Sequence, residues 1–165
     1  MGKRSVVVKV NAPKLSKYTV KGDTLAEVRK NLDKREEWGL YDATQNFKSG
    51  GKVDAQGQVA SVTIELNPVI ELPTWSGYSK ATKPQKASWD AMLKKLTAHE
   101  YKHHDIQVAG AAALKKAIES AKELDSGALD TLIEKAQTDT QKAQDSYDTR
   151  SGHGAKEGVE LDESA

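Results

Sequence analysis

The stretch HEYKHH occupies residues 99–104 and decides how the rest of the chain is interpreted. It places His99, Glu100 and His103 in the order His-Glu-x-x-His. On an α-helix, residues four apart lie about 40° apart around the axis and about 6 Å along it, so two imidazoles at this spacing can bind one metal ion. Glu100 falls on the same side of the helix, where a carboxylate can accept a proton from a metal-bound water. This spacing is typical of zinc peptidases, although it also occurs in ordinary helices.

The flanking residues predict one long amphipathic helix from about Gln85 to Leu124. His99 and His103 fall within its apolar face, and two histidines with a carboxylate in one turn are costly to bury unless something compensates them. A divalent cation is the simplest compensation. The apolar face is marked by residues that recur at steps of three and four: Trp89, Met92, Leu93, Leu96, Ile106, Gly110, Ala113, Leu114, Ala117, Ile118, Ala121 and Leu124.

A second helix is predicted after a turn at 125–127, where Asp-Ser-Gly is a helix-ending signal. Apolar residues then recur at helical spacing from Leu129 to Tyr147. Because the connection is short, the two helices should be antiparallel neighbours, forming a helical hairpin over 85–147.

The C-terminal segment offers a third metal ligand. Ser126 lies midway between His99 and His153, so the chain should return to the height of His99 as it reaches His153. Glycines on both sides of His153 would let its imidazole turn toward the site. Asp148, about one turn earlier, is the alternative oxygen ligand, and His153 could also be a residue of a flexible tail.

The sequence leaves open which group would stabilise the developing oxyanion of a peptidase reaction. Tyr147, Arg150, His104 and Tyr101 are the candidates. His104 could also orient Glu100, or be an ordinary surface residue.

The chain resembles the bacterial domain of unknown function 922, a family described as predicted secreted zinc-dependent proteases. The resemblance rests on HEYKHH at 99–104, YDTRSGHGAKEG at 147–158, YTVKGDT at 18–24 and VTIELNPVIELPTW at 62–75. It implies a zincin-like metallopeptidase site in which His99, Glu100, His103 and His153 occupy matching positions.

Three departures from the family pattern accompany this resemblance. Ser151 stands where Thr is expected, and Glu157 where Gln is expected. The chain has no cysteine, so the disulfide of many members cannot be carried over, and histidine and carboxylate are the remaining metal ligands.

These observations predict a peptidase in which His99, His103 and His153 hold one Zn²⁺ and leave a position for water. Glu100 would act as the general base toward a peptide or protein substrate. The alternative is a non-catalytic, metal-containing module that binds peptides or cell-wall glycans. Tyr18–Leu25 resembles the opening of a glycan-binding lysin motif, but a strand, a turn and a capped helix explain the same residues. A glutamate at the second motif position favours catalysis.

Composition indicates a single domain over residues 1–165, with a sheet region at 1–75, the hairpin at 85–147 and a ligand loop at 148–165. Hydrophobic residues make up 37% and charged residues 30%, typical of a rather polar globule. With 25 basic and 24 acidic residues, no net field favours nucleic acid or an anionic membrane. No apolar run is long enough to span a membrane. The sequence predicts no oligomeric state.

The N-terminal MGKRSVVVKV has too short an apolar run for a signal-peptide core, so no signal peptide is visible. Localisation is therefore expected from the resemblance alone, which implies a secreted or periplasmic protein.

The predicted fold class is α+β, a small antiparallel sheet with one short helix beside the hairpin. The strands are expected at Val6–Val10, Tyr18–Lys21, Tyr41–Lys48 and Val59–Leu72, and the short helix at about 24–33. In the last strand, apolar residues alternate with polar ones, which suits an antiparallel sheet with one solvated face. Its segment Val69–Thr74 is the candidate edge for a substrate chain.

Overall fold

The structure is a computed structural model that describes residues 4–49 and 56–165. Its strands are β1 (Ser5–Val10), β2 (Lys14–Val20), β3 (Leu40–Ser49) and β4 (Ser61–Trp75). Its α-helices are α1 (Leu25–Leu32), α2 (Lys83–Ser120) and α3 (Ser126–Ser151), and 3₁₀ turns occur at Tyr78–Lys80 and Ala155–Glu157. The predicted α+β class is confirmed. The connection between the third and fourth predicted strands falls mainly on residues 50–55, outside the described residues.

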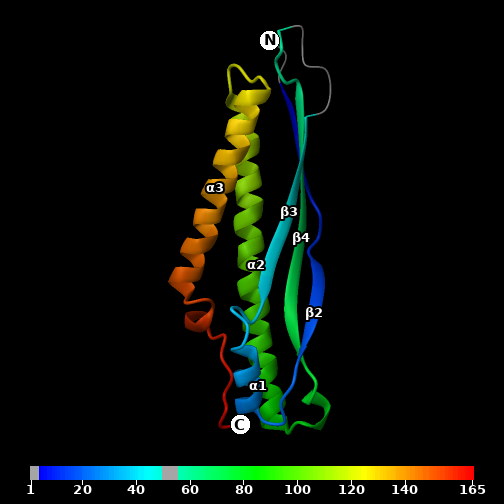
Figure 1. Ribbon diagram of the computed structural model, residues 1–165, viewed down its shortest axis with the longest axis vertical. Helices are drawn as coiled ribbons and strands as arrows, with labels where there is room; N and C mark the ends of the chain where they lie inside the picture. Colours follow the sequence, from blue (N-terminus) through cyan, green and yellow to red (C-terminus); the bar gives the residue numbers. More distant parts are fainter. Residues whose placement is uncertain (1–3, 50–55) are drawn as a thin grey trace. The chain divides into compact units, whose positions relative to one another are not determined.

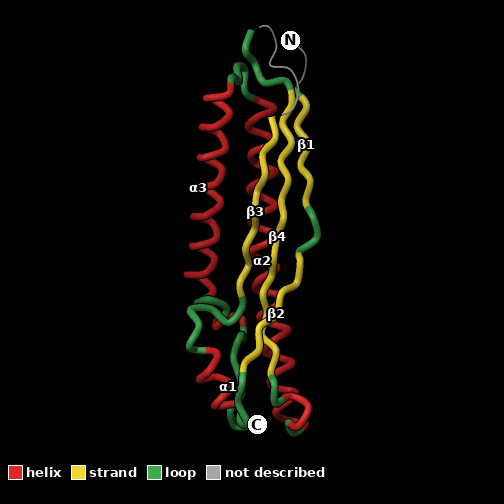
Figure 2. The backbone as a smooth tube through the Cα atoms, turned by 45° about the vertical axis from the view of Figure 1, so that its right-hand side comes forward, coloured by secondary structure: helices red, strands yellow, loops and turns green. Residues whose placement is uncertain are grey.

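The sheet is mixed, so the predicted antiparallel sheet is wrong. β1 pairs with β4 in parallel, Ser5 opposite Ser61, and β2 also pairs with β4 in parallel, Lys14 opposite Val69. β3 pairs with β4 as well. Figure 2 shows the pairing of β1 with β4. The segment Val69–Thr74 pairs with β2 along one side, Val69 opposite Lys14 and Thr74 opposite Thr19. Its role as an edge for a substrate chain stays a prediction.

The burial pattern of β4 explains why its sequence suggested antiparallel partner strands. Alternate residues of β4 are buried, among them Val62, Ile64 and Leu66. That alternation reports that one face of the strand is covered, and it is the same whichever way the partner strand runs.

Helix α1 begins at a reciprocal cap that the sequence signalled. The Thr24 hydroxyl accepts a hydrogen bond from the backbone N–H of Glu27 at 3.2 Å, and the Glu27 carboxylate accepts one from the backbone N–H of Asp23 at 2.7 Å. Its buried residues are Leu25, Val28 and Leu32. The segment that follows α1 contains Glu37 and Tyr41, which lie at the candidate site described below.

Helix α2 starts near the predicted position and ends earlier. Thr82 and Gln85 cap its start by exchanging hydrogen bonds between side chain and backbone. The helix stops at Ser120 rather than Leu124, and Leu124 is buried in the connection. Asp125 caps α3 by accepting from the backbone N–H of Ala128 at 2.8 Å. The predicted turn residues Ser126 and Gly127 therefore open α3.

The chain forms two compact units. Unit 1 comprises Met1–Ala12, Ala43–Pro68 and His104–Asp145, and unit 2 comprises Pro13–Asp42, Val69–His103 and Ser146–Ala165. In unit 1, α2 and α3 run side by side (Figure 1), and Gly110 lies so close to Thr140 that a Cβ there would collide with the threonine hydroxyl. The single domain predicted over 1–165 stays a prediction.

Unit 2 contains the candidate site. Its core joins α1, the first part of α2 and the C-terminal segment through a cluster of buried side chains: Val20, Leu25, Val28, Leu32, Trp75, Trp89, Met92, Leu96, Val159 and Leu161. Because Leu96 and Val159 belong to this core, the neighbouring His99 and Gly154 are held on well-packed segments. No helix within the described ranges has the length and apolar character needed to cross a bilayer.

Candidate metal centre

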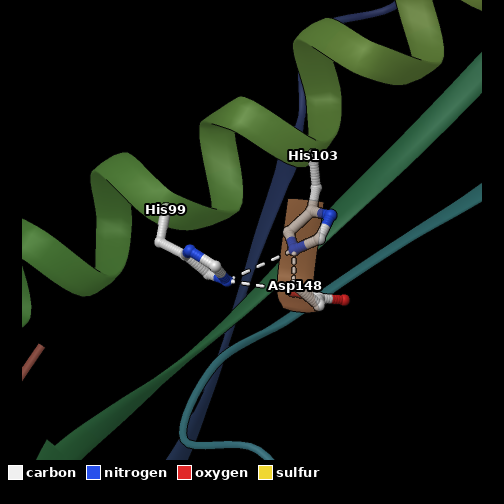
Figure 3. Close-up of side chains that lie close together, drawn as sticks. All are labelled: His99, His103 and Asp148. Atoms are coloured by element: carbon white, nitrogen blue, oxygen red, sulfur yellow. Dashed lines mark hydrogen bonds and ion pairs between the residues drawn. The ribbon is translucent and has the colours of Figure 1, made fainter. Parts of the chain in front are cut away.

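One turn of α2 carries three buried polar side chains. His99, Glu100 and His103 are only 5%, 3% and 8% exposed. The end of α3 brings Asp148 against the two imidazoles, and Figure 3 shows the three side chains converging. His103 Nε2 lies 2.9 Å from Asp148 Oδ1, His99 Nε2 lies 3.4 Å from it, and the two Nε2 atoms are 3.3 Å apart.

These three groups fit a metal ion. Asp148 Oδ1 is buried and makes no hydrogen bond with the described residues, despite the two nearby imidazole nitrogens. An unsatisfied buried carboxylate oxygen is costly, and a cation between the three atoms would satisfy it. One ligand atom each from His99, His103 and Asp148 lies within 4.8 Å of the others, which suits a single ion.

Glu157 fixes the orientation of His99 from behind. Its Oε2 lies 2.9 Å from His99 Nδ1, so a proton on Nδ1 is donated to the carboxylate and Nε2 presents its lone pair to the site. The Tyr147 hydroxyl donates to both oxygens of Glu157, at 2.9 and 2.7 Å. Burial alone would raise the pKa of Glu157, but the hydrogen bonds from His99 and Tyr147 outweigh it and lower that pKa.

Aromatic rings hold both imidazoles in place. The Tyr147 ring stacks on His99 with centroids 4.9 Å apart, and the Tyr41 ring stacks on His103 at 6.4 Å. Desolvation by burial, followed by its hydrogen bond to Glu157, raises the pKa of Tyr147, so this hydroxyl stays a donor. Packing and hydrogen bonds thus fix the orientation of both imidazoles.

Replacing Glu157 by Ala should weaken metal binding by about 10- to 100-fold, because the group that orients His99 is lost. Glu157→Gln should lose less, since an amide oxygen also accepts the Nδ1 proton. Titration against a competing chelator measures both affinities. Glu160→Ala, three residues along the same segment with an exposed side chain, is the matched control. Equal affinities for Glu157→Ala and the control would show that Glu157 has no part in the site.

Glu100 is buried beside the three converging groups. It accepts a hydrogen bond from the backbone of Tyr41, while burial, followed by the charges of Glu37 and Asp148, raises its pKa to about 8. Gly39 lies directly over it, since a Cβ there would come 2.5 Å from Glu100 Oε1. The backbone just before β3 therefore packs tightly over the carboxylate. Glu100 and His99 also line a cavity of about 250 Å³.

His153 follows α3 in a tight helix-ending turn. Its backbone N–H donates to the carbonyl of Asp148 at 2.9 Å, and the N–H of Gly152 donates to that of Thr149 at 3.4 Å, which is the Schellman arrangement. The His153 side chain is 65% exposed and lines the same cavity as His99 and Glu100.

The structure brings His99 and His103 together with Asp148, and it groups His153 with Glu37 and Asp148. The predicted ligand role of His153 stays a prediction, and Asp148, the alternative ligand in the sequence, takes the position between the histidines. Glu157 and Glu37 were not predicted as site residues. Glu157 appeared only as a departure from the family pattern, and nothing local marks Glu37.

The other sequence candidates lie in different settings. The Tyr147 hydroxyl is bonded to Glu157, and Tyr101 is 40% exposed. Arg150 is exposed. His104 is half-buried and belongs to unit 1.

The fold and the site together define an α+β protein with a buried His-His-Asp group that can hold a metal ion. The model of the family described as "Bacterial protein of unknown function (DUF922)" matches residues 15–154, and the chain belongs to this family. The match includes the two histidines, Asp148 and His153, and it ends before Glu157. No curated protein and no solved structure matches the chain.

Proposed function

We propose that this protein is a zinc-dependent peptidase. The observation that carries the proposal is the placement of Glu100: a carboxylate that is 3% exposed, on the wall of a cavity, in the same helical turn as two histidines that converge on Asp148. The substrate class is a peptide or protein, and the predicted secreted or periplasmic location stays a prediction.

His99, His103 and Asp148 would hold the ion. When bound, zinc supplies a Lewis acid that polarises a carbonyl and makes water a stronger acid. Histidine nitrogens and a carboxylate oxygen are ordinary zinc ligands, and three protein ligands are typical of catalytic rather than structural zinc sites.

Glu100 would move the proton. Its carboxylate accepts a proton from the water that attacks the scissile carbonyl and then gives it to the departing amine. The Tyr41 backbone N–H and the close approach of Gly39 hold this side chain in one position, so its proton acceptor is fixed relative to the cavity.

A purely structural metal site gives no reason for Glu100. Burial of this carboxylate, followed by the charges of Glu37 and Asp148, disfavours its charged form and raises its pKa. A buried carboxylate with a raised pKa, in a cavity next to residues that can hold a metal ion, is typical of a catalytic group.

The purified protein should bind about one equivalent of zinc and cleave members of a mixed peptide library. Elemental analysis after zinc loading and desalting gives the stoichiometry, and mass spectrometry of the library detects cleavage. Cleavage should disappear with a chelator and return with added zinc.

A His99→Ala variant is the control for metal content. Wild-type protein that retains no more zinc than this variant would overturn the metal site. Zinc binding without cleavage of any peptide would instead favour the non-catalytic binding module.

A further inference from the structure

We infer that His153, oriented by Glu37, donates a hydrogen bond from Nε2 to the substrate carbonyl oxygen as that oxygen gains negative charge. The inference rests on the proposed peptidase function and assigns the oxyanion-stabilising group that the sequence left open.

The backbone of His153 is held in an unfavourable conformation. With φ of 52°, it is the one non-glycine residue with positive φ in the part of the chain that the structure describes. Left-handed backbone is unfavourable for residues with a side chain, and where it persists at a functional site it often positions that side chain. Glycine would fit this turn without strain, as Gly152 and Gly154 do on either side. A histidine at this position therefore indicates that the imidazole side chain itself has a role.

The position of the imidazole suits an oxyanion donor. His153 lines the cavity that His99 and Glu100 also line, so a carbonyl bound there lies within its reach. Its Nδ1 is 3.6 Å from Glu37 Oε1. A carboxylate on the Nδ1 side pairs with a protonated Nδ1 and orients the ring, so Nε2 donates in the imidazolium, which carries a proton on both nitrogens.

The other candidate donors are less suitable. The Tyr147 hydroxyl donates to Glu157 and supports His99, so using it elsewhere would break that support. Tyr101, Arg150 and His104 are not among the residues that line the cavity, whereas His153 is.

Two other roles for His153 make different predictions. As a ligand of the ion at His99 and His103, it would be needed for zinc binding. As part of a second metal site with Glu37 and Asp148, it would be needed for a second equivalent of zinc. If His153 is a hydrogen-bond donor to the substrate, it is needed neither for zinc binding at His99 and His103 nor for a second equivalent of zinc.

The test uses the full-length, zinc-loaded protein and two probes, a cleavable peptide and a phosphinic analogue of that peptide, which resembles the tetrahedral transition state. His153→Gly removes the imidazole and suits the left-handed backbone, so the fold should be retained, which thermal unfolding checks. Zinc stoichiometry and affinity should stay within about threefold of wild type. Affinity for the phosphinic analogue and kcat should fall by about 100-fold, with KM changed less than about threefold.

Glu37→Gln should lower affinity for the phosphinic analogue by about 10-fold, because an orienting partner is worth less than the donor itself. The control is Asp105→Asn, an exposed acid on α2 that is not among the residues lining the cavity, which should match wild type. Unchanged affinity of His153→Gly for the analogue, loss of its zinc, or a second zinc equivalent that depends on His153 would each overturn the inference. Wild-type protein that binds zinc but neither cleaves the peptide nor binds the analogue would overturn the proposed function itself.

Discussion

Glu100→Gln should lower peptide turnover at least about a hundredfold while the protein keeps its zinc. The expected loss is large because glutamine has the shape of glutamate and cannot accept the proton. Zinc should remain because the converging groups are His99, His103 and Asp148, and Glu100 is not one of them. Initial rates on the best library peptide and elemental analysis of the same samples measure both effects.

The variant should also fold normally. Glutamine is neutral, can still accept from the Tyr41 backbone and fits beneath Gly39, so the packing around residue 100 is preserved. Asp105→Asn, an exposed acid on the same helix, is the control and should retain full turnover. A Glu100→Gln enzyme as active as this control would show that another group takes the proton.

The functional turn was predictable because its information is local. Three side chains within five residues of a helix share one face by geometry alone, so the spacing placed His99, Glu100 and His103 together. The structure confirms that all three are buried. The capped start of α1 was predictable for the same reason, since Thr24 and Glu27 are three residues apart.

Strand direction was not predictable from the same kind of pattern. The alternation in β4 reports a covered face, whereas β1 and β2 run parallel to β4 because the chain returns through long connections before β4 begins. The end of α2 was misplaced for a related reason. Leu124 continues the apolar spacing, but its backbone N–H bonds to the Gln58 side chain at 2.5 Å and its carbonyl accepts from Val59 at 2.8 Å, so it is buried in a connection.

Because α2 ends earlier than predicted, a different residue of α3 lies beside the histidines. The connection between α2 and α3 occupies residues 121–125, whereas the sequence-based prediction centred it on Ser126. Counted from the middle of the observed connection, His99 lies as many residues before it as Tyr147 lies after it, so Tyr147 and not His153 returns to the level of His99. Asp148 therefore meets the histidines. Glu37 and Glu157 contribute from segments far along the chain, where no spacing rule connects them with the helix.

Asp148→Ala should weaken zinc binding by more than about a hundredfold, and His153→Gly should leave it nearly unchanged. Residues that only orient a ligand are worth about 10- to 100-fold in metal affinity, so a group that contributes the ligand atom should be worth more. Asp148 Oδ1 lies 2.9 Å from His103 Nε2 and 3.4 Å from His99 Nε2, so it is placed to share an ion with both histidines. His153 Nδ1 lies instead 3.6 Å from Glu37 Oε1. Competition with a chelator of known affinity gives both constants.

Asp145→Ala is the control for Asp148→Ala, because it removes an exposed acid one turn earlier on α3 and should leave zinc affinity unchanged. His103→Ala sets the scale for losing a ligand. The sequence-based prediction makes the opposite forecast: if His153 is the third ligand, His153→Gly should resemble His103→Ala, and Asp148→Ala should resemble Glu157→Ala. Loss of zinc in His153→Gly with retention in Asp148→Ala would assign the third ligand to His153, and it would remove the basis for His153 as an oxyanion donor because its nitrogen would be committed to the ion.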